Sequence, residues 1–326
     1  GETRRFSQSE MKTFLRCKRK WYLSEYRRLA PVGNSPTGPL RSGTRVHTAL
    51  EAFYTPGQDV FWVLSLEQED DWDTYVRNCA ERGEDPDTSV ADEFAKDCQL
   101  ERIMIEGYGE WIAESGVDAG LETIAVEEIV TVPGESVYPD LVDEFGPFNV
   151  VGKLDMRVRR ESDGARMFMD HKTAQSLTMA LPTLQMDMQM MHYMWLESMN
   201  TPEGERSDGA FYNVLKKVKR TRAAKPPFFA RYEVHHNDDE LYSYRVRLSQ
   251  IISEILAEER RLMLYPQSAD HIAYPNPTRD CAWDCPFFAL CPAMDDGSRY
   301  EDMIRDQFVT RDPLARYVEG DKPEAV

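Results

Sequence analysis

The chain has 326 residues, of which 41% are hydrophobic and 29% are charged. This length and composition predict a folded protein with one large domain or two modest ones. No run of ~20 apolar residues is present, which excludes a membrane helix of the usual kind, and the N-terminus has no apolar signal segment, so we expect a cytoplasmic protein with no membrane partner.

Charge is unevenly distributed along the chain. The net charge of −18 argues at first against a nucleic-acid partner, because phosphates attract lysine and arginine. However, residues 67–101 hold 13 acidic and 3 basic side chains, whereas residues 4–28 hold 9 basic and 2 acidic ones. Residues 216–225 add six positive charges and no acid. A basic path on an acidic body therefore remains compatible with DNA binding, and Lys18, Arg19, Lys20 and residues 216–225 are candidates for phosphate contacts.

The first third of the chain has the periodicity of helices. Helical segments are predicted at residues 7–28, 44–54 and 60–115. Ser7 or Ser9 is the candidate N-cap of the first helix, and the Pro- and Gly-rich residues 31–39 form a loop after it. A break is expected near residues 83–87, and the acidic face around it is expected to be solvated.

The middle of the chain changes to the alternation of strands. Strands are predicted at residues 121–132, 148–160, 166–170, 208–218 and 228–235, and helices at 181–199 and 238–264. This order predicts an α/β fold (an α+β mixed sheet) flanked by helices, with an added helical region.

Two carboxylates and a lysine fall in neighbouring predicted strands. Asp155 lies within the strand Gly152-Lys153-Leu154-Asp155, and Asp170-His171-Lys172 ends the next strand. Antiparallel neighbours can place Asp155 beside Asp170, and Asp170 shares a strand face with Lys172. Such an oxygen-rich set suits Mg²⁺ or Mn²⁺ bound with a substrate phosphate, and a nearby ammonium stabilises developing charge. Taken singly, each of these residues is more often an ordinary surface charge.

The motif Asp170-His171-Lys172-Thr173, after the G-x-x-D strand, resembles the signature of the RecB-like branch of the PD-(D/E)xK nucleases. Gly43 to His47 matches the family's G-x-x-x-H helix, and the resemblance implies that His47 is a metal ligand with Asp155, Asp170 and the backbone carbonyl of His171. Gln189 and Tyr193 match the Q-x-x-x-Y helix that organises the active site in that family, and they lie one helical turn apart.

A glutamate is also expected in the strand that precedes G-x-x-D. Glu127 is the candidate by position in the family pattern, and its neighbour Glu128 is the alternative. The resemblance covers residues 7 to about 292. It implies a restriction-endonuclease-like core at residues 116–265, after an N-terminal helical region at 1–115 and before a C-terminal segment at 266–326.

Four of the six cysteines form a second pattern. Cys281, Cys285 and Cys291 lie within eleven residues, and Cys17 lies near the other end of the chain. Four thiolates suit Zn²⁺ or an iron–sulfur cluster, and their spacing alone does not choose between them. AddB-type and CRISPR-associated relatives carry one cysteine before the nuclease motifs and three after them. The resemblance therefore implies a [4Fe–4S] cluster that joins the terminal segments, although C-x3-C replaces the family's C-x2-C. Cys79 and Cys98 are expected to be unliganded.

These features predict a Mg²⁺- or Mn²⁺-dependent DNA exonuclease that acts on single-stranded ends. Its short length and the lack of a Walker A motif resemble stand-alone phage and CRISPR-associated members of the branch, with possible protein partners in repair, recombination or replication and a possible oligomer. Two alternatives stay open at this point: a non-catalytic subunit that binds DNA ends or assembles complexes, and a structure-selective endonuclease.

Overall fold

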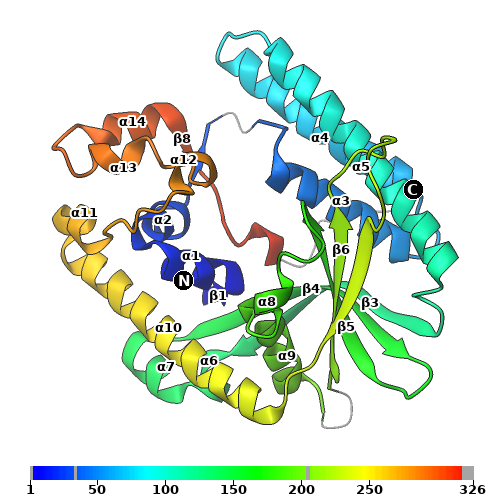
Figure 1. Ribbon diagram of the computed structural model, residues 1–326. Helices are drawn as coiled ribbons and strands as arrows, with labels where there is room; N and C mark the ends of the chain where they lie inside the picture. The colour runs from blue at the N-terminus through cyan, green and yellow to red at the C-terminus, as the bar shows by residue number, and fades with distance from the viewer. Residues whose placement is uncertain (1–2, 33–34, 203–205, 318–326) are drawn as a thin grey trace. The chain divides into compact units, whose positions relative to one another are not determined.

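The computed structural model describes residues 3–32, 35–202 and 206–317 (Figure 1). The chain forms two compact units, each built from separated segments. Unit 1 comprises residues 1–32, 129–152 and 238–326, and unit 2 comprises residues 33–128 and 153–237.

Unit 2 is built on a mixed sheet. Its strands are β5 (Arg166–Ala174), β6 (Gly209–Lys216), β7 (Phe229–Val234) and the second half of β4 (Phe148–Arg160), in the order β4-β5-β6-β7. The pair β5–β6 is parallel, while β4–β5 and β6–β7 are antiparallel. The additional strand β3 (Leu121–Pro133) pairs with β4. The parallel pair needs a crossover connection, which residues 175–208 and their two helices supply.

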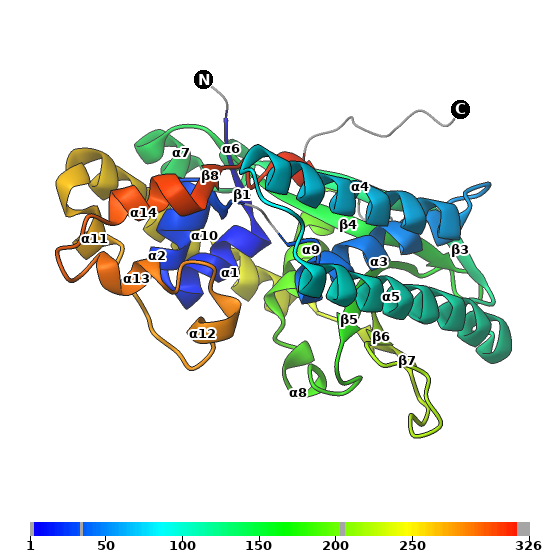
Figure 2. The ribbon, with the colours of Figure 1, turned by 90° about the horizontal axis from the view of Figure 1, so that it is seen from above.

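Three helices pack together and cover one face of this sheet. They are α3 (Pro39–Tyr54), α4 (Val60–Glu81) and α5 (Thr88–Ser115), and they lie side by side in Figures 1 and 2. Val46, Leu64 and Tyr108 pack with Leu215 and Phe229 of the sheet in one apolar cluster. Buried Arg45 also joins the three helices, because it pairs with Glu101 of α5 and Asp71 of α4.

The opposite face of the unit 2 sheet carries α9 (Met188–Asn200), which follows the short α8 (Leu181–Leu184). Phe168 of β5 contacts Tyr193 of α9 edge-on, with ring centroids 5.8 Å apart. Side chains alternate along β5, so Asp170 and Lys172 point to the same face as Phe168, while Met169 and His171 point toward the α3 side. The expected mixed sheet flanked by helices is confirmed.

Unit 1 contains two small strand pairings. Strand β1 (Arg4–Ser7) runs parallel to residues 148–151 at the start of β4, and β2 (Leu29–Pro31) pairs with β8 (Phe308–Thr310). Its helical segments are α1 (Gln8–Arg16), α2 (Lys18–Trp21), η1 (Tyr22–Tyr26), α6 (Gly134–Val137), α7 (Pro139–Phe145), α10 (Asp238–Leu264), η2 (Pro266–Ser268), α11 (Ala269–Ile272), α12 (Cys281–Asp284), α13 (Leu290–Ala293), α14 (Tyr300–Gln307) and η3 (Ala315–Tyr317).

The prediction of one continuous helix over residues 7–28 is wrong. Ser7 caps α1 as expected, but Cys17 adopts an extended conformation (φ −163°, ψ 114°) and separates α1 from α2. The apolar period continues across this break, which is why the sequence pattern did not reveal it. The helix predicted at 181–199 is likewise divided, because Asp187 caps a new helix by accepting from the backbone N–H groups of Gln189 and Met190.

Other segments differ in smaller ways. Residues 133–146, between two predicted strands, contain the short helices α6 and α7, and β5 extends four residues beyond the predicted end at Asp170. The predicted break near residues 83–87 and the long helix α10 are confirmed. Within the described ranges, no helix is both long and apolar enough to cross a membrane.

Candidate active site

The two candidate carboxylates lie where β4 and β5 separate. The ladder between these strands pairs Met156 with Met169, and the next residues toward the site are Asp155 and Asp170. The backbone N–H of His171 donates to Asp155 Oδ2 at 2.8 Å instead of continuing the ladder. Asp155 therefore uses a side-chain oxygen where the sheet would use a carbonyl. The two carboxylates lie within electrostatic reach of one another where the β4–β5 ladder ends, because Asp155 contributes to the raised pKa of Asp170.

Asp170 is buried, with 1% of its surface exposed. Its Oδ1 accepts from Gln189 Nε2 at 3.0 Å, and its Oδ2 lies 2.8 Å from Lys172 Nζ. That Oδ2 atom makes no hydrogen bond with good geometry to any described residue. Burial raises the pKa of Asp170 to about 6, with a further rise from Asp155, while the Lys172 ammonium opposes the shift. Asp170 Oδ2 is thus a buried oxygen that can still accept a hydrogen bond or bind a cation.

His47 reaches Asp155 from α3. The two side chains form an ion pair with 3.4 Å between His47 Nδ1 and Asp155 Oδ2. Burial favours the neutral form of both groups, but their mutual attraction outweighs it: the pKa of His47 is raised, and the pKa of Asp155 lies below its usual range. Helix α3 comes close to β5 here, since a Cβ added at Gly43 would lie 3.4 Å from Thr173 Oγ1.

Lys172 completes the charged cluster. Burial lowers the pKa of its ammonium, but Asp170 and Asp155 outweigh that effect and raise the pKa overall. The group therefore stays charged at neutral pH. On α9, Gln189 Nε2 also contacts Tyr193 Oη at 3.1 Å, so the two residues of the Q-x-x-x-Y pattern are linked to each other and to Asp170.

Glu127 and Glu128 occupy different environments. Glu127 has a left-handed backbone (φ 54°), which is uncommon outside glycine, and its carboxylate pairs with Lys153. Burial raises the pKa of Glu127, and Asp155 contributes to the rise, so its carboxylate lies within electrostatic reach of the site. Glu128 instead pairs with Arg157, and 42% of its side chain is exposed. The geometry favours Glu127 over Glu128.

The structure adds residues that no motif identified. Tyr54, Tyr108, Asn213 and Arg231 surround the ring of His171 or hydrogen-bond to its partners. They come from α3, α5, β6 and β7, and no local spacing connects them. Only the polar Asn213 within the otherwise apolar residues 210–215 could have drawn attention to this part of the sheet.

The donor types at the strand ends fit a divalent cation. Two carboxylates and an imidazole suit Mg²⁺ or Mn²⁺, and the buried Asp170 Oδ2 offers an acceptor without a hydrogen bond among the described residues. As the side chains stand, however, no three His, Cys, Asp or Glu side chains in the described part of the chain are gathered like metal ligands. Lys172 and His47 instead supply the positive charge beside the two carboxylates.

The four patterned cysteines all belong to unit 1. Backbone N–H groups of Asn276 and Thr278 donate to Cys17 Sγ at 3.4 Å and Cys281 Sγ at 3.3 Å, and Arg19 Nη1 lies 3.7 Å from Cys291 Sγ. The hydrogen bond from Thr278 lowers the pKa of Cys281. Burial raises the pKa of Cys285 and Cys291, and Cys17 contributes to both shifts, so the thiols lie within electrostatic reach of one another.

Arg19, near Cys17 in unit 1, does not contact phosphate as expected. The Arg19 guanidinium is only 2% exposed; it pairs with Asp295 and donates to the carbonyls of Ala273 and Asp270. The prediction that Arg19 contacts phosphate is therefore wrong. Lys18 and Lys20 pair with Glu258 and Asp284.

A mixed sheet flanked by helices, with opposed carboxylates and a lysine at its strand ends, defines the class of a restriction-endonuclease-like core. The chain belongs to the PD-(D/E)XK nuclease superfamily, whose family model matches residues 5–292. A comparison with curated proteins found no match.

Proposed function

We propose that this protein is a divalent-metal-dependent DNA exonuclease that hydrolyses phosphodiester bonds from single-stranded ends. The observation that carries the proposal is the proximity of Asp155 and Asp170 where the β4–β5 ladder ends at Met156 and Met169, with Lys172 2.8 Å from Asp170. Membership of the nuclease superfamily supports the reaction class. The restriction to DNA and to ends rests on the sequence resemblance.

Asp155, Asp170, His47 and the carbonyl of His171 would hold Mg²⁺ or Mn²⁺. When bound, such an ion polarises the scissile phosphate and makes a coordinated water more acidic. The protein prepares for it by keeping Asp155 ionised, because the low pKa of that carboxyl leaves it charged at neutral pH. The His171 N–H fixes the direction of the Asp155 carboxylate.

Lys172 has two tasks in this proposal. Its ammonium neutralises Asp170 in the resting protein, and it stabilises the negative charge that develops on the phosphate during attack. The two tasks are compatible because Lys172 lies on the same strand face as Asp170 and keeps 30% of its side chain exposed. Gln189 donates to Asp170 Oδ1, which leaves Oδ2 as the oxygen directed toward Lys172.

Phosphate contacts are expected along residues 216–225, the basic segment that follows β6. Lys217 and Lys219 reach Pro39 and Gln99, and Arg220 pairs with Glu110. Lys216, Arg222 and Lys225 are the better candidates, since the described structure records no ion pair for them. A strand of DNA on this segment would remain within unit 2, which also contains the carboxylates.

We propose further that Cys17, Cys281, Cys285 and Cys291 ligate a structural [4Fe–4S] cluster. Support comes from their common unit, their mutual electrostatic influence and the N–H donors directed at three of the sulfurs. Such donors accompany thiolates that carry charge. The division into segments 1–115, 116–265 and 266–326 stays a prediction.

End-labelled linear and closed circular single-stranded DNA, incubated with Mg²⁺, Mn²⁺ or EDTA, test the proposal, with Asp170→Asn as the matched control. We expect mononucleotides or short products from linear DNA with either metal, intact circles, and no products with EDTA or the variant. Cleavage of circles would indicate an endonuclease. Binding to ends without cleavage under any metal would indicate a non-catalytic subunit and overturn the proposal.

A further inference from the structure

A hydrogen-bond network lies on the α3 side of the unit 2 sheet, behind the candidate carboxylates. Its members are Tyr54, Tyr108, Asp118, Asn213 and Arg231, and it ends at the ring of His171. Asn213 and Tyr108 are fully buried, and the Arg231 side chain is 4% exposed. A buried polar network of this size is costly unless every donor and acceptor in it has a hydrogen-bond partner.

Arg231 fixes the direction of the network because a guanidinium can only donate. Its Nε donates to Asn213 Oδ1 at 3.1 Å. Its Nη1 donates to the Val117 carbonyl at 3.4 Å and to Asp118 Oδ1 at 2.5 Å, and its Nη2 donates to the Tyr108 and Tyr54 hydroxyls at 3.1 and 3.5 Å. All five N–H groups therefore have acceptors.

The orientation of Arg231 also determines which of the remaining groups donate and which accept. Since the Asn213 carbonyl faces Arg231, the Asn213 amide nitrogen must face Tyr108 Oη at 3.1 Å and His171 Nδ1 at 2.9 Å. His171 Nδ1 must then accept, so a neutral His171 carries its proton on Nε2. Tyr54 donates to Asp118 Oδ2 at 2.9 Å, so the Tyr108 hydroxyl donates to Tyr54 Oη at 2.6 Å.

We infer that Arg231 and Asn213 are positioning residues that hold the metal-binding strand end by fixing the His171 tautomer. The inference rests on the proposed function. The His171 ring is clamped between Asn213 and the stacked Tyr54 ring, 5.8 Å away at 17°. Its backbone N–H meanwhile donates to Asp155 Oδ2. In the other tautomer, Nδ1–H would face the Asn213 N–H, the ring would turn, and the peptide that orients Asp155 would move with it.

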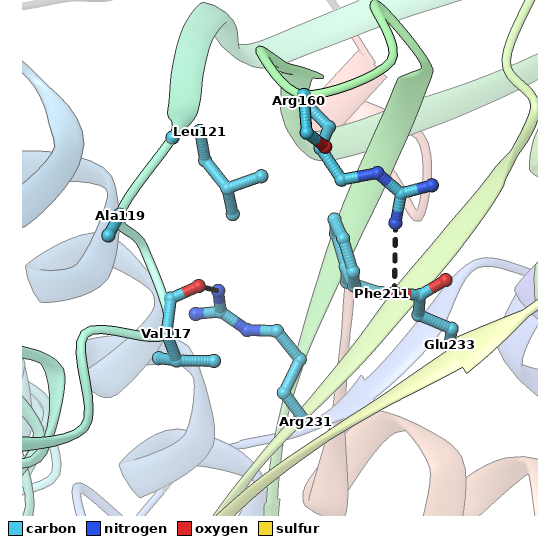
Figure 3. Close-up of a pocket in the computed structure, with 9 residues that line it drawn as sticks. Val117, Ala119, Leu121, Arg160, Phe211, Arg231 and Glu233 are labelled. Carbon is cyan, nitrogen blue, oxygen red and sulfur yellow. Dashed lines mark hydrogen bonds and ion pairs between the residues drawn. The ribbon is translucent and has the colours of Figure 1, made fainter.

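Arg231 also lines a pocket of about 260 Å³, shown in Figure 3, where its guanidinium points to the Val117 carbonyl. The other arginine there, Arg160, pairs with Glu233 and Asp163. Because the N–H groups of Arg231 are already used, this pocket offers no free donor from Arg231 to an anionic ligand. The geometry therefore favours a positioning role for Arg231 over ligand binding.

The first test measures the tautomer of His171 in the wild-type protein. Long-range ¹H–¹⁵N correlation spectra of the wild-type protein with ¹⁵N-labelled histidine distinguish the two neutral tautomers, because the unprotonated ring nitrogen resonates far downfield of the protonated one. The chain has six histidines, and His171→Asn assigns the signal of interest. We expect the Nε2–H form for His171. An Nδ1–H form, or a mixture of the two, would overturn the inference.

The second test moves the proton of neutral His171 from Nε2 to Nδ1. In Asn213→Asp the side chain keeps its shape and its contact with Arg231 but can no longer donate, so His171 should carry a proton on Nδ1. We expect the Kd for Mn²⁺, measured by calorimetry, to rise about tenfold, as for other residues that orient ligands indirectly. Unchanged Mn²⁺ affinity together with a changed tautomer would contradict the positioning role.

Tyr54→Phe is the matched control. It removes a hydroxyl from the same network and retains the stacked ring, but it leaves the contacts from Arg231 to Asn213 and on to His171 in place. A merely structural role predicts that both variants change Mn²⁺ affinity in step with their loss of stability; the inference predicts a changed tautomer in Asn213→Asp alone. If the wild-type protein binds Mn²⁺ with the expected tautomer but cleaves no DNA, the proposed function fails and the positioning role stands.

Discussion

The strand-end site of unit 2 and the cysteine segment of unit 1 differ in how their polar groups are held. Asp155, Asp170 and Lys172 lie on adjacent strands, and each is fixed by a hydrogen bond or ion pair to a neighbouring residue. The four cysteines lie on short helices and connecting loops, with single donors to three of the sulfurs. The first site is therefore organised by the fold itself, whereas the second would depend on its ligand for order.

The largest effect is expected from breaking the strand-end site. Asp170→Asn and Lys172→Ala should each lower kcat by about 10²–10³-fold or more, because both groups act on charge that develops during attack. Folding should persist, since both residues lie on a strand that Met167 and Met169 anchor in the core. Cleavage rates and circular dichroism of the purified variants check this; Asp163→Asn, an exposed change in the hairpin before β5, should leave cleavage unchanged.

The second effect concerns the cysteine segment. Cys17→Ser should remove the brown colour and broad visible absorbance of anaerobically purified protein and destabilise it. A cross-link between Cys17 and Cys281 closes most of the chain, which by analogy with disulfides is worth about 4–5 kcal/mol for long loops. Iron analysis and urea denaturation measure both effects, with Cys98→Ser as the control. A colourless wild-type protein with one zinc per chain would favour the other metal and leave the nuclease proposal intact.

His47 distinguishes a metal ligand from a packing residue. His47→Ala should raise the Mn²⁺ concentration needed for half-maximal cleavage by about ten- to a hundredfold, because the pair with Asp155 and one nitrogen donor are lost. Metal titrations and thermal denaturation on the same preparation separate the roles. Lower stability at an unchanged metal response would show that His47 only fills space beside His171, whose ring centroid is 6.3 Å away.

Some features of these sites could be predicted from the sequence and others could not. Asp155, Asp170 and Lys172 were predictable as neighbours because strand alternation and a hairpin are local features, and β4 and β5 do pair as antiparallel neighbours up to Met156 and Met169. The break at Cys17 was not, since the amphipathic period runs through it. The Arg231 network was not either, because its members come from separated elements and meet only after the sheet and α3–α5 have packed.

A smaller effect should separate Glu127 from Glu128. Glu127→Gln removes the carboxylate that pairs with Lys153 near Asp155, so we expect activity to fall several-fold, up to about tenfold. Glu128→Gln removes a partly exposed partner of Arg157 and should change activity little. Steady-state rates for the two variants, compared at saturating Mn²⁺, decide between them; equal rates would remove both from the site.

The smallest expected effect is a change in acid sensitivity. Burial lowers the pKa of His171 to about 3, below its ordinary value of 6.5, so neutral His171 is favoured in the folded state. Its contribution to stability is complete above pH 6.5 and declines as pH falls toward 3. His171→Asn cannot take up this proton, so it should lose less stability than the wild type between pH 7.5 and 5. Urea midpoints at both pH values measure the difference, and parallel losses would contradict it.

The interleaving of the two units has a consequence for synthesis on the ribosome. All segments of unit 2 have been made once residue 237 is added, whereas unit 1 still lacks its third segment, residues 238–326. At roughly 5–20 residues per second, Cys17 precedes Cys281 by tens of seconds. The first two segments of unit 1, residues 1–32 and 129–152, therefore wait for residues 238–326, while unit 2 can already fold. If the proposed cluster is bound, its loading would have to wait until Cys291 has been made, whereas Asp155, Asp170 and Lys172 would already be part of a completed unit 2.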